Sequence, residues 1–374
     1  MNIDSLRNID VKQGMDFLCL KNSVGQEWLF PVKNTYRFLS LYFPSSIKGK
    51  IVRFLLPLCV FLPFLRKIFR IEKEKFCLPK ELDSCIKKVF NLDGYEFAVF
   101  GGSPCAHQKV TLMIMKDNLY LGYCKLSDNK EVFEIFKHES EVLNLLKNKG
   151  VDSIPNVLFC GELKNGLFVF AQTTERAGLV RKAMLGDKVV FSFLNKVKSL
   201  TSQKMDYWET NFCETLKLLK SNVCLLGNKK DDVLRVIDRV EKCLVKNKYE
   251  YCVYHGDFTP WNSFIVNDRL FVFDFEYSQK SYPVFLDFFH FFTQTHIYDN
   301  YMNKEDIWNE YVKCRDEMKE YISDVDFCYS CYLLAIMSFY LSRDEGFLNE
   351  RLRQCFEIWL FLLFNIEKNY EIIE

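Results

Sequence analysis

The stretch that decides the fold is YHGDFTPWN, at residues 254–262, which is followed by FDFE at residues 273–276. The first stretch contains Asp257, with Asn262 five positions later. The second stretch contains Asp274, twelve positions after Asn262. Short runs of aromatic and β-branched residues flank both stretches, so we expect a strand to lead into the first Asp and a short hairpin to return the second one.

These residue types match the chemistry of phosphoryl transfer from ATP. That reaction needs one carboxylate near the acceptor hydroxyl, and a carboxylate with an amide oxygen to hold Mg²⁺ on the phosphates. Mg²⁺ prefers hard oxygen ligands, which favours Asn and Asp over His or Cys. The two stretches therefore predict a nucleotide-dependent phosphotransfer site.

The pattern H-G-D-x-x-x-x-N, followed by a strand that ends in D-F-E, resembles the aminoglycoside phosphotransferase family. That family includes choline-kinase-like small-molecule kinases of protein-kinase-like fold, and the resemblance covers about residues 80–300. It implies an α+β bilobal fold, in which a small antiparallel-sheet N-lobe with one helix precedes a mainly helical C-lobe. An N-terminal extension would come before both lobes.

The resemblance also implies roles for five residues of the second half. Asp257 resembles the catalytic base, and Asn262 and Asp274 resemble the Mg²⁺ ligands. His255 matches the residue that braces the catalytic loop, and Asp287 matches a downstream Asp that supports this loop.

The first half of the chain carries three further features in the order that a kinase fold requires. Gly101, Gly102 and Ser103 form a turn after the first expected strand, where Gly lets backbone N–H groups approach phosphate. Lys125, on the third expected strand, is placed to bind the α- and β-phosphates. Glu139, on the following expected helix, lies where the family has the Glu that pairs with this Lys.

Two positions in this half leave some choice. Glu141 competes with Glu139 as the partner of the Lys, although the family spacing E-x-x-x-L-x-x-L fits Glu139. The strand at residues 167–171 ends in Gln172, where the resemblance implies a hinge between the lobes whose backbone would hydrogen-bond the adenine.

The expected domain organisation has three parts. Residues 1–90 form a partly helical N-terminal extension, residues 91–174 form the nucleotide-binding N-lobe, and residues 175–374 form the helical C-lobe with the catalytic loop at 254–277. In the N-lobe, three strands, a helix and two strands follow one another. A helix broken by a proline is expected at residues 72–91.

The extension contains the longest uncharged apolar run of the chain, FLLPLCVFLPFL at residues 54–65. At twelve residues with two prolines, this run falls short of the roughly 20 residues needed to span a bilayer. Within residues 48–70 it has three basic residues on each side, which is typical of a segment that lies on an anionic membrane surface. A buried helical hairpin that packs on the next domain is the alternative.

Composition narrows the function classes. Fifty Lys and Arg against forty-nine Asp and Glu give a net charge of +1, without the whole-chain basic footprint of a dedicated nucleic-acid binder.

The fifteen cysteines are scattered and odd in number, so we expect reduced thiols, and the C-x-x-C of Cys328 and Cys331 predicts buried helix rather than a zinc site. The N-terminus lacks signal-peptide features. We therefore expect a cytoplasmic protein, or one peripheral at the inner membrane face through residues 48–70.

Three functional hypotheses follow. The short link at residues 278–282 leaves no room for the activation segment of a protein kinase, which favours a small-molecule, sugar or glycan acceptor. The first hypothesis is γ-phosphoryl transfer from ATP or GTP, with Mg²⁺, to a hydroxyl of such an acceptor. The second is the same chemistry on a lipid-linked or surface-polysaccharide acceptor at the inner membrane face. The third is a nucleotide-binding pseudokinase-like module, which no feature favours because every catalytic position is intact.

Overall fold

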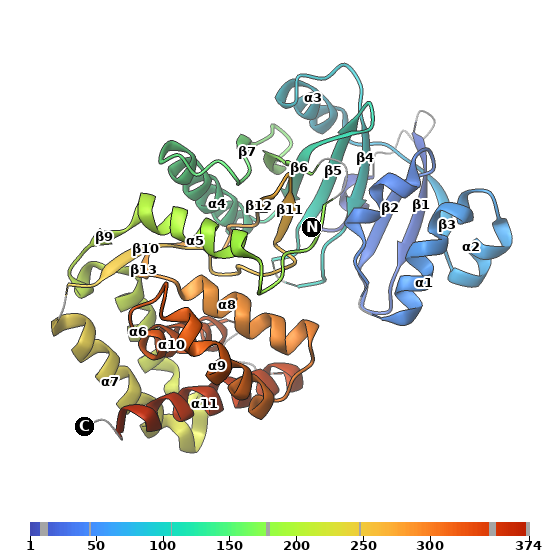
Figure 1. Ribbon diagram of the computed structural model, residues 1–374. Coiled ribbons are helices and arrows are strands. Elements are labelled where there is room, and N and C mark those ends of the chain that lie inside the picture. Colours follow the sequence, from blue (N-terminus) through green and yellow to red (C-terminus); the bar gives the residue numbers. More distant parts are fainter. Residues whose placement is uncertain are drawn as a thin grey trace. The chain divides into compact units, whose positions relative to one another are not determined.

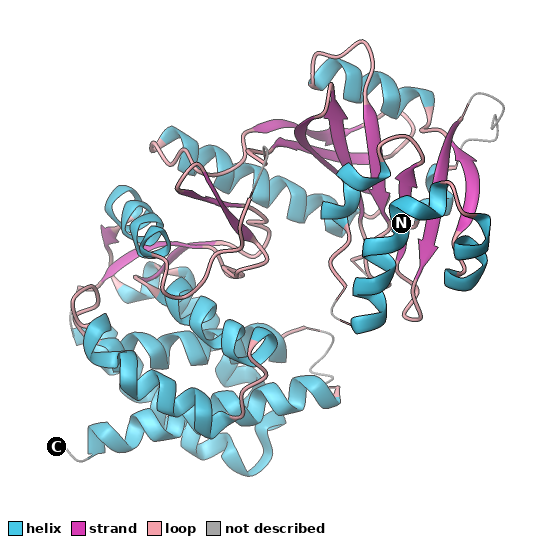
Figure 2. Cartoon of the chain, turned by 45° about the vertical axis from the view of Figure 1, so that its right-hand side comes forward, coloured by secondary structure: helices cyan, strands magenta, loops and turns pink. Residues whose placement is uncertain are grey.

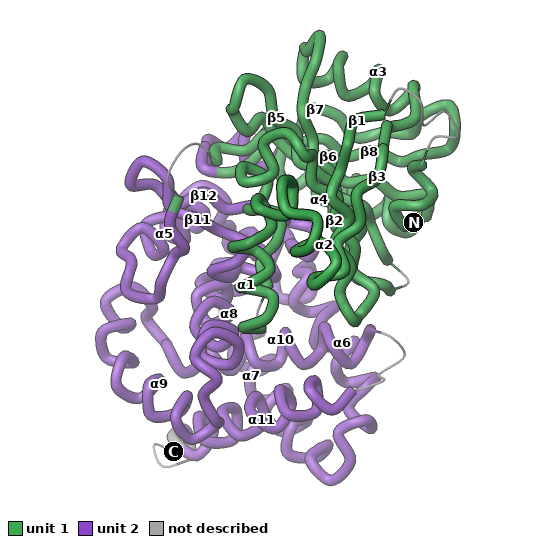
Figure 3. Tube along the Cα trace, turned by 90° about the vertical axis from the view of Figure 1, so that its right-hand side faces the viewer, with its two compact units in different colours: residues 1–144, 154–180 green, residues 145–153, 181–374 purple. Residues whose placement is uncertain are grey.

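The computed structural model describes residues 1–7, 14–44, 46–105, 107–176, 180–246, 248–343 and 349–371. The chain falls into two compact units, which Figure 3 shows in different colours. The first consists of residues 1–144 and 154–180, and the second of residues 145–153 and 181–374. Strands dominate the first and helices the second (Figure 2), so we call them the sheet unit and the helical unit.

In its described residues, the sheet unit contains one eight-stranded sheet with the order β3-β1-β2-β4-β5-β6-β8-β7 (Figure 1). All neighbouring strands are antiparallel. The strands are β1 (Met15–Lys21), β2 (Glu27–Pro31), β3 (Glu72–Phe76), β4 (Glu96–Phe100), β5 (Val110–Lys116), β6 (Leu119–Ser127), β7 (Val157–Glu162) and β8 (Phe168–Thr173). The helices are η1 (Ile3–Leu6), η3 (Thr35–Leu41), α1 (Ile47–Leu55), η4 (Leu56–Val60), α2 (Pro63–Phe69), α3 (Lys80–Val89) and α4 (Lys130–Asn148).

The part of the sheet from β4 to β8, with α4 between β6 and β7, is the arrangement expected of the N-lobe. Asp117 and Asn118 both have positive φ, at 50° and 67°, so they form the kind of two-residue turn that matches the twist of a hairpin. This turn fixes the register of β5 against β6, in which Thr111 lies opposite Lys125. The predicted fold class, an antiparallel-sheet part followed by a mainly helical part, is confirmed.

The N-terminal extension does not form a part of its own, which corrects the expected division at residue 90. Its strands β1, β2 and β3 continue the sheet beyond β4. In β1, Phe17 and Cys19 pack into the apolar cluster on one face, while Leu18 and Leu20 pack into the cluster on the other face. Because a strand buried on both faces is apolar at every position, it lacks the alternation that identifies a strand in a sequence.

The helix expected at residues 72–91 is also corrected. Residues before Pro79 form the edge strand β3, and only those after it form a helix, α3, with Pro79 as its N-cap residue. The charged residues of β3 are largely exposed, as is common at a sheet edge. A proline is tolerated at the start of a helix, where no backbone N–H is needed, so it separates the two elements rather than kinking one.

Helices cover both faces of this sheet. On one face, Leu82 and Ile86 of α3 pack against the strands. On the other face, Phe38 of η3, Val52 of α1 and Leu56 of η4 do so. One side of the apolar run at residues 54–65 therefore belongs to the core.

The helical unit is built from longer helices and short strands. Its helices are α5 (Lys188–Thr201), η5 (Tyr207–Glu209), α6 (Asn211–Asn222), η6 (Val223–Lys229), α7 (Lys230–Lys246), α8 (Leu286–Gln294), η7 (Thr295–Asp299), α9 (Lys304–Met318), α10 (Val325–Leu341) and α11 (Glu350–Glu371). Its strands are β9 (Gln203–Lys204), β10 (Glu250–Tyr254), β11 (Ser263–Val266), β12 (Arg269–Val272) and β13 (Gln279–Pro283). They form the sheet β13-β10-β9 and the hairpin β11-β12.

Two details of this unit bear on the sequence predictions. The segment expected as a short link after Asp274 contains β13, which pairs with β10. Cys328 and Cys331 both lie buried in α10, where a buried helix was predicted. In the part of the chain that the structure describes, every helix is too short or too polar to cross a bilayer.

Candidate active site

The loop that follows β10 is held by close backbone packing. Gly256 has φ +84°, and a Cβ atom there would lie 2.4 Å from the carbonyl oxygen of Tyr277. Only glycine fits both the conformation and the contact. The loop therefore begins pressed against the segment that follows Asp274.

His255 ties the loop to the end of the β11-β12 hairpin. Its Nδ1 accepts the backbone N–H of Asp257 at 3.2 Å, and its Nε2 lies 3.1 Å from the carbonyl oxygen of Phe273. These partners assign the ring proton to Nε2, which donates to that carbonyl. Burial lowers the pKa of His255 to about 4, so the imidazole is neutral near pH 7.

Asp287, in the first turn of α8, supports the same loop from another side. Its Oδ2 accepts the backbone N–H of His255 at 2.8 Å, and its Oδ1 accepts that of Gly256 at 3.3 Å. Burial raises the pKa of Asp287 to about 7, although the two N–H groups favour the ionised form and act in the opposite direction. The side chain thus fixes the backbone of the two residues that precede Asp257.

Asp257 is held at both carboxylate oxygens and still reaches solvent. Asn262 donates from Nδ2 to Oδ2 at 2.7 Å, and Nε2 of His290 lies 3.2 Å from Oδ1. The side chain of Asp257 is 33% exposed, so an acceptor can reach a carboxylate whose orientation is already fixed. This is the geometry that a positioned base requires.

His290 is a site residue that the sequence interpretation missed. It lies three positions after Asp287 on α8, so both side chains are on the same face of that helix. This i, i+3 spacing was the signal that could have identified it. His290 is 3% exposed, and its Nδ1 is buried without a hydrogen-bond partner among the described residues.

We predict that His290→Leu lowers kcat about ten-fold and leaves the KM for the nucleotide within about two-fold, because one of the two contacts that orient Asp257 is lost. His290→Gln keeps a donor of similar reach and should retain more of the activity. Steady-state kinetics of both variants test this. Equal losses in the two variants would indicate a packing role instead.

Asn262 and Asp274 offer the oxygen atoms expected of a Mg²⁺ site. Because the side-chain Nδ2 of Asn262 donates to Asp257, the side-chain oxygen of Asn262 is directed elsewhere. The backbone carbonyl oxygen of Asn262 accepts the N–H of Phe273 at 3.1 Å. This backbone bond ties Asn262 to the residue before Asp274. Asp274 has φ +71°, which is uncommon for a residue other than glycine and is often kept at functional sites. A carboxylate and an amide oxygen without sulfur or imidazole fit Mg²⁺.

In the sheet unit, Lys125 of β6 and Glu139 of α4 form a buried ion pair at 2.6 Å. Glu139 is 0% exposed and Lys125 is 6% exposed, whereas Glu141 is exposed, so Glu139 is the residue that contacts the Lys. The ring of Phe170 lies 5.6 Å from the Lys125 ammonium and stacks on Phe136 of α4. This stacking positions α4 against the sheet.

The turn after β4 is shaped by its glycines. Gly102 has φ +74°, and a Cβ atom there would lie 2.3 Å from the carbonyl oxygen of Lys109, so no larger residue fits. The N–H of Gly101 donates to the carbonyl oxygen of Glu27 at 2.8 Å, and this donor is therefore engaged within the sheet unit.

Ser103 and Gln172 are the remaining residues for which a nucleotide contact is expected. The Oγ of Ser103 accepts a hydrogen bond from Nε2 of Gln26 at 2.7 Å. Gln172 is buried in β8, one residue before the strand ends, and pairs with both β6 and β7. A backbone contact to adenine stays a prediction for this segment.

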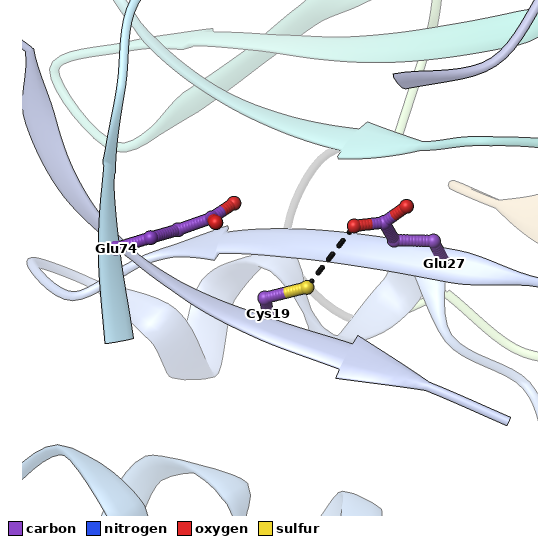
Figure 4. A group of neighbouring side chains, drawn as sticks. All are labelled: Cys19, Glu27 and Glu74. Atoms are coloured by element: carbon purple, nitrogen blue, oxygen red, sulfur yellow. Dashed lines mark hydrogen bonds between the residues drawn. The ribbon is translucent and has the colours of Figure 1, made fainter. Parts of the chain in front are cut away.

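A separate group of side chains in the sheet unit lies close enough together to hold a metal ion, but ion pairs already compensate the charges of its carboxylates. Figure 4 shows Cys19, Glu27 and Glu74, with the Cys19 thiol donating to Glu27 at 3.1 Å. Arg7 lies 2.7 Å from Glu74, and Lys21 lies 3.3 Å from Glu27. Burial raises the pKa of the Cys19 thiol, and a protonated thiol is a poor metal ligand. We interpret the group as an ion-pair network that holds the Arg7 side chain in place.

The pKa of His255 is lowered and that of Asp287 is raised, so the two residues should have opposite effects on how stability changes with pH. His255 has a pKa of about 4 against an ordinary 6.5, so its contribution is present above pH 6.5 and is lost as the pH falls towards 4. Asp287 has a pKa of about 7 against an ordinary 3.8, so its contribution is present below pH 3.8 and is lost as the pH rises through 7. Between pH 5 and 7 the two contributions nearly cancel.

Single substitutions should uncover each contribution. We expect Asp287→Asn to be less stable at pH 5 than at pH 7, and His255→Gln to be less stable at pH 7 than at pH 5. Each change should be about 2 kcal/mol. Urea unfolding of both variants and of the wild type at pH 5, 6 and 7 measures it. If the free energy of unfolding changed with pH equally and in the same direction in both variants, the pKa shifts assigned to His255 and Asp287 would be contradicted.

No family model matches the chain, and no curated protein matches it in sequence. The choline kinase LicA from Streptococcus pneumoniae has 13% identity and a TM-score of 0.49, over 76% of this chain and 99% of the other. The ADP-bound aminoglycoside phosphotransferase APH(2'')-Ib has 16% identity and a TM-score of 0.44, over 77% and 99%.

The amicoumacin kinase hAmiN, solved with AMP-PNP, has 12% identity and a TM-score of 0.41, over 78% of this chain and 94% of the other. These structures belong to the group of phosphotransferases and small-molecule kinases that the motif order resembles. Because all three scores lie below 0.5, we base the function on the side chains of this chain.

Proposed function

We propose that the chain is an ATP- and Mg²⁺-dependent phosphotransferase that moves the γ-phosphoryl group to a hydroxyl of a small molecule. The observation that carries this proposal is the arrangement around Asp257. Its carboxylate is oriented by Asn262 and His290 and remains 33% exposed, and Asn262 is in turn bonded to the residue before Asp274. A base and two oxygen ligands for a hard cation are thus joined within one unit.

Each residue has a role that its surroundings support. Asp257 orients the acceptor hydroxyl and accepts its proton as the hydroxyl oxygen attacks the γ-phosphorus, while the bond from that phosphorus to the bridging oxygen breaks and ADP leaves. Lys125 neutralises charge on the phosphates, while Glu139 holds its ammonium group. Asn262 and Asp274 would hold Mg²⁺, which supplies charge neutralisation on the phosphates when bound. His255 and Asp287 keep the loop in place, so positioning accounts for most of the rate.

The segment after Asp274 supports a small acceptor. Strand β13 begins at Gln279 and pairs with β10, and α8 follows at Leu286. Strand β13 takes up residues 279–283 of the stretch between Asp274 and α8, so this described stretch contains no long loop for docking a protein substrate. A sugar or glycan hydroxyl, and GTP in place of ATP, fit the same arrangement.

A lipid-linked or surface-polysaccharide acceptor is the second candidate. The observation that favours it is the exposed apolar and basic segment within residues 43–70 of the sheet unit. The chemistry at Asp257 would be unchanged, because only the location of the acceptor hydroxyl differs.

The direct test is transfer of label from γ-labelled ATP, with Mg²⁺, to a panel of acceptors. The panel contains aminoglycosides, choline, ethanolamine, amino sugars and a bacterial glycolipid extract. Asp257→Asn is the negative control, and Asp268→Asn, the same change in the exposed β11-β12 turn, is the matched positive control. Label in one acceptor class that is lost only in Asp257→Asn supports the proposal. Nucleotide binding without transfer to any acceptor would favour a pseudokinase-like module.

A further inference from the structure

The segment formed by α1, η4 and α2 has apolar residues on two sides. On the inner side, Val52, Leu56 and Cys59 follow one another at steps of four and three and are buried against the sheet. On the outer side, large apolar residues are exposed, and we call this set the outer apolar surface. It consists of Phe43, Ile47, Ile51, Phe54, Leu58, Phe61, Leu62, Phe64 and Ile68.

This surface is unlike the rest of the chain. Nine of the 23 exposed large apolar side chains of the described residues belong to it. Among these residues, the phenylalanines with exposed side chains are Phe43, Phe54, Phe61 and Phe64, and all four lie here. Phe54 and Phe61 are 80% and 79% exposed. Soluble proteins rarely gather apolar side chains in this way unless the surface binds something.

The elements that carry these residues are in contact with one another. Helix α2 packs on η4, and η4 packs on α1, beside strands β1 and β3 (Figure 1). No residue of α2 is buried in the core. The Arg53 guanidinium lies over the ring of Phe43 at 4.8 Å, so basic and aromatic groups share one region of the surface.

The charge of the segment indicates what covers it. Residues 47–70 contain six basic residues and no acidic residue, although the whole chain has a net charge of only +1. Lys48, Lys50, Lys67 and Arg70 are exposed beside the apolar side chains. If a second copy of this surface packed against it through a two-fold axis, six basic residues would face six others and their like charges would repel. Anionic lipid headgroups, with acyl chains beneath them, complement both the charge and the apolar side chains.

We propose that the outer apolar surface binds the face of an anionic lipid bilayer. Phe54, Phe61 and Phe64 enter the boundary between headgroups and acyl chains, while Lys48, Lys50 and Lys67 and the three arginines contact lipid phosphates. The chain lies on the bilayer and does not cross it. This inference does not depend on phosphotransfer, so the two can fail separately.

The test is co-sedimentation of the full chain with two kinds of vesicle, phosphatidylcholine alone and phosphatidylcholine with about 30 mole per cent phosphatidylglycerol, of which only the second has a negative surface potential. We expect at least about ten-fold tighter binding to the anionic vesicles, and loss of most of this binding on raising the salt from roughly 0.1 M to 0.5 M. Binding should also be independent of ATP and of any acceptor.

Two variants separate the apolar and basic contributions. Phe54→Ser/Phe61→Ser/Phe64→Ser removes the inserting side chains, and its matched control is Leu218→Ser/Leu225→Ser/Val312→Ser on the helical unit, where these residues are also exposed. Lys48→Gln/Lys50→Gln/Lys67→Gln removes charge, and its matched control is Lys230→Gln/Lys242→Gln/Lys246→Gln on α7.

Each outcome decides the proposal. Loss of about ten-fold or more in binding by both variants, with wild-type binding in both controls and unchanged thermal unfolding, supports it. Equal binding to neutral and anionic vesicles overturns it, as does the absence of binding to either. A concentration-dependent dimer in light scattering that the phenylalanine variant abolishes would identify a second copy as the occupant and would also overturn it.

Discussion

Asp257→Asn is expected to lower kcat by about 10²–10⁴-fold, the range that a positioned general base contributes. Asn has the same shape and can still bond to Asn262 or His290, but it cannot accept the proton of the acceptor hydroxyl. In the proposed site, residues other than Asp257 would contact the phosphates and the cation, so the Kd of the nucleotide with Mg²⁺ should change by about two-fold or less. Single-turnover transfer and isothermal titration of the nucleotide measure the two quantities on the same preparation.

The control for this variant is Asp268→Asn in the β11-β12 turn. Asp268 has φ +56°, a conformation that Asn adopts as readily as Asp, and it is exposed. The control should therefore turn over at the wild-type rate. A wild-type rate in Asp257→Asn would remove Asp257 from the chemistry, and a joint loss of turnover and nucleotide binding would point to a collapsed loop.

The spacing of the motif predicted that Asp257 and Asn262 belong to one loop, whereas their roles in catalysis stay a prediction. The five-position step from Asp257 to Asn262 allows the loop to turn back, so that the Asn amide reaches the carboxylate of the Asp. The side chains of Lys125 and Glu139 meet because a strand and the next helix are short, regular elements with strong sequence patterns. Local pattern therefore determined which residues lie together within each unit.

What the sequence did not predict depends on contacts between distant segments. His290 contacts Asp257 across 33 positions, and only the packing of α8 on the loop brings them together. Strand β13 is half-polar and short, and it forms because β10 offers it an edge. The strands β1 to β3 were missed because a strand buried on both faces and a charged edge strand both lack alternation.

Lys125→Met is expected to affect both stability and activity, and the two effects can be separated. The substitution leaves the buried Glu139 carboxylate without its ammonium partner, which should lower the free energy of unfolding by about 3–5 kcal/mol. In the proposed function it also removes the positive charge that Lys125 would place on the phosphates, which should lower kcat by about 10²–10³-fold. Urea unfolding and single-turnover transfer measure these effects.

The same sheet offers a matched ion pair. Lys116 of β5 and Asp93 also lie 2.6 Å apart, but their side chains are 35% and 90% exposed. Solvent screens such a pair, so Lys116→Met should leave both the free energy of unfolding and the transfer rate nearly unchanged. The two lysines thus share the substitution and the distance and differ in burial.

The double variant Lys125→Met/Glu139→Gln decides what the buried pair is for. Glutamine removes the buried charge, so we expect more than half of the lost stability to return. If Lys125 acts on the nucleotide, transfer stays low in the double variant even though the fold has recovered. If transfer returns together with stability, the pair only anchors α4 to the sheet, and the positive charge that the phosphates need must come from another residue.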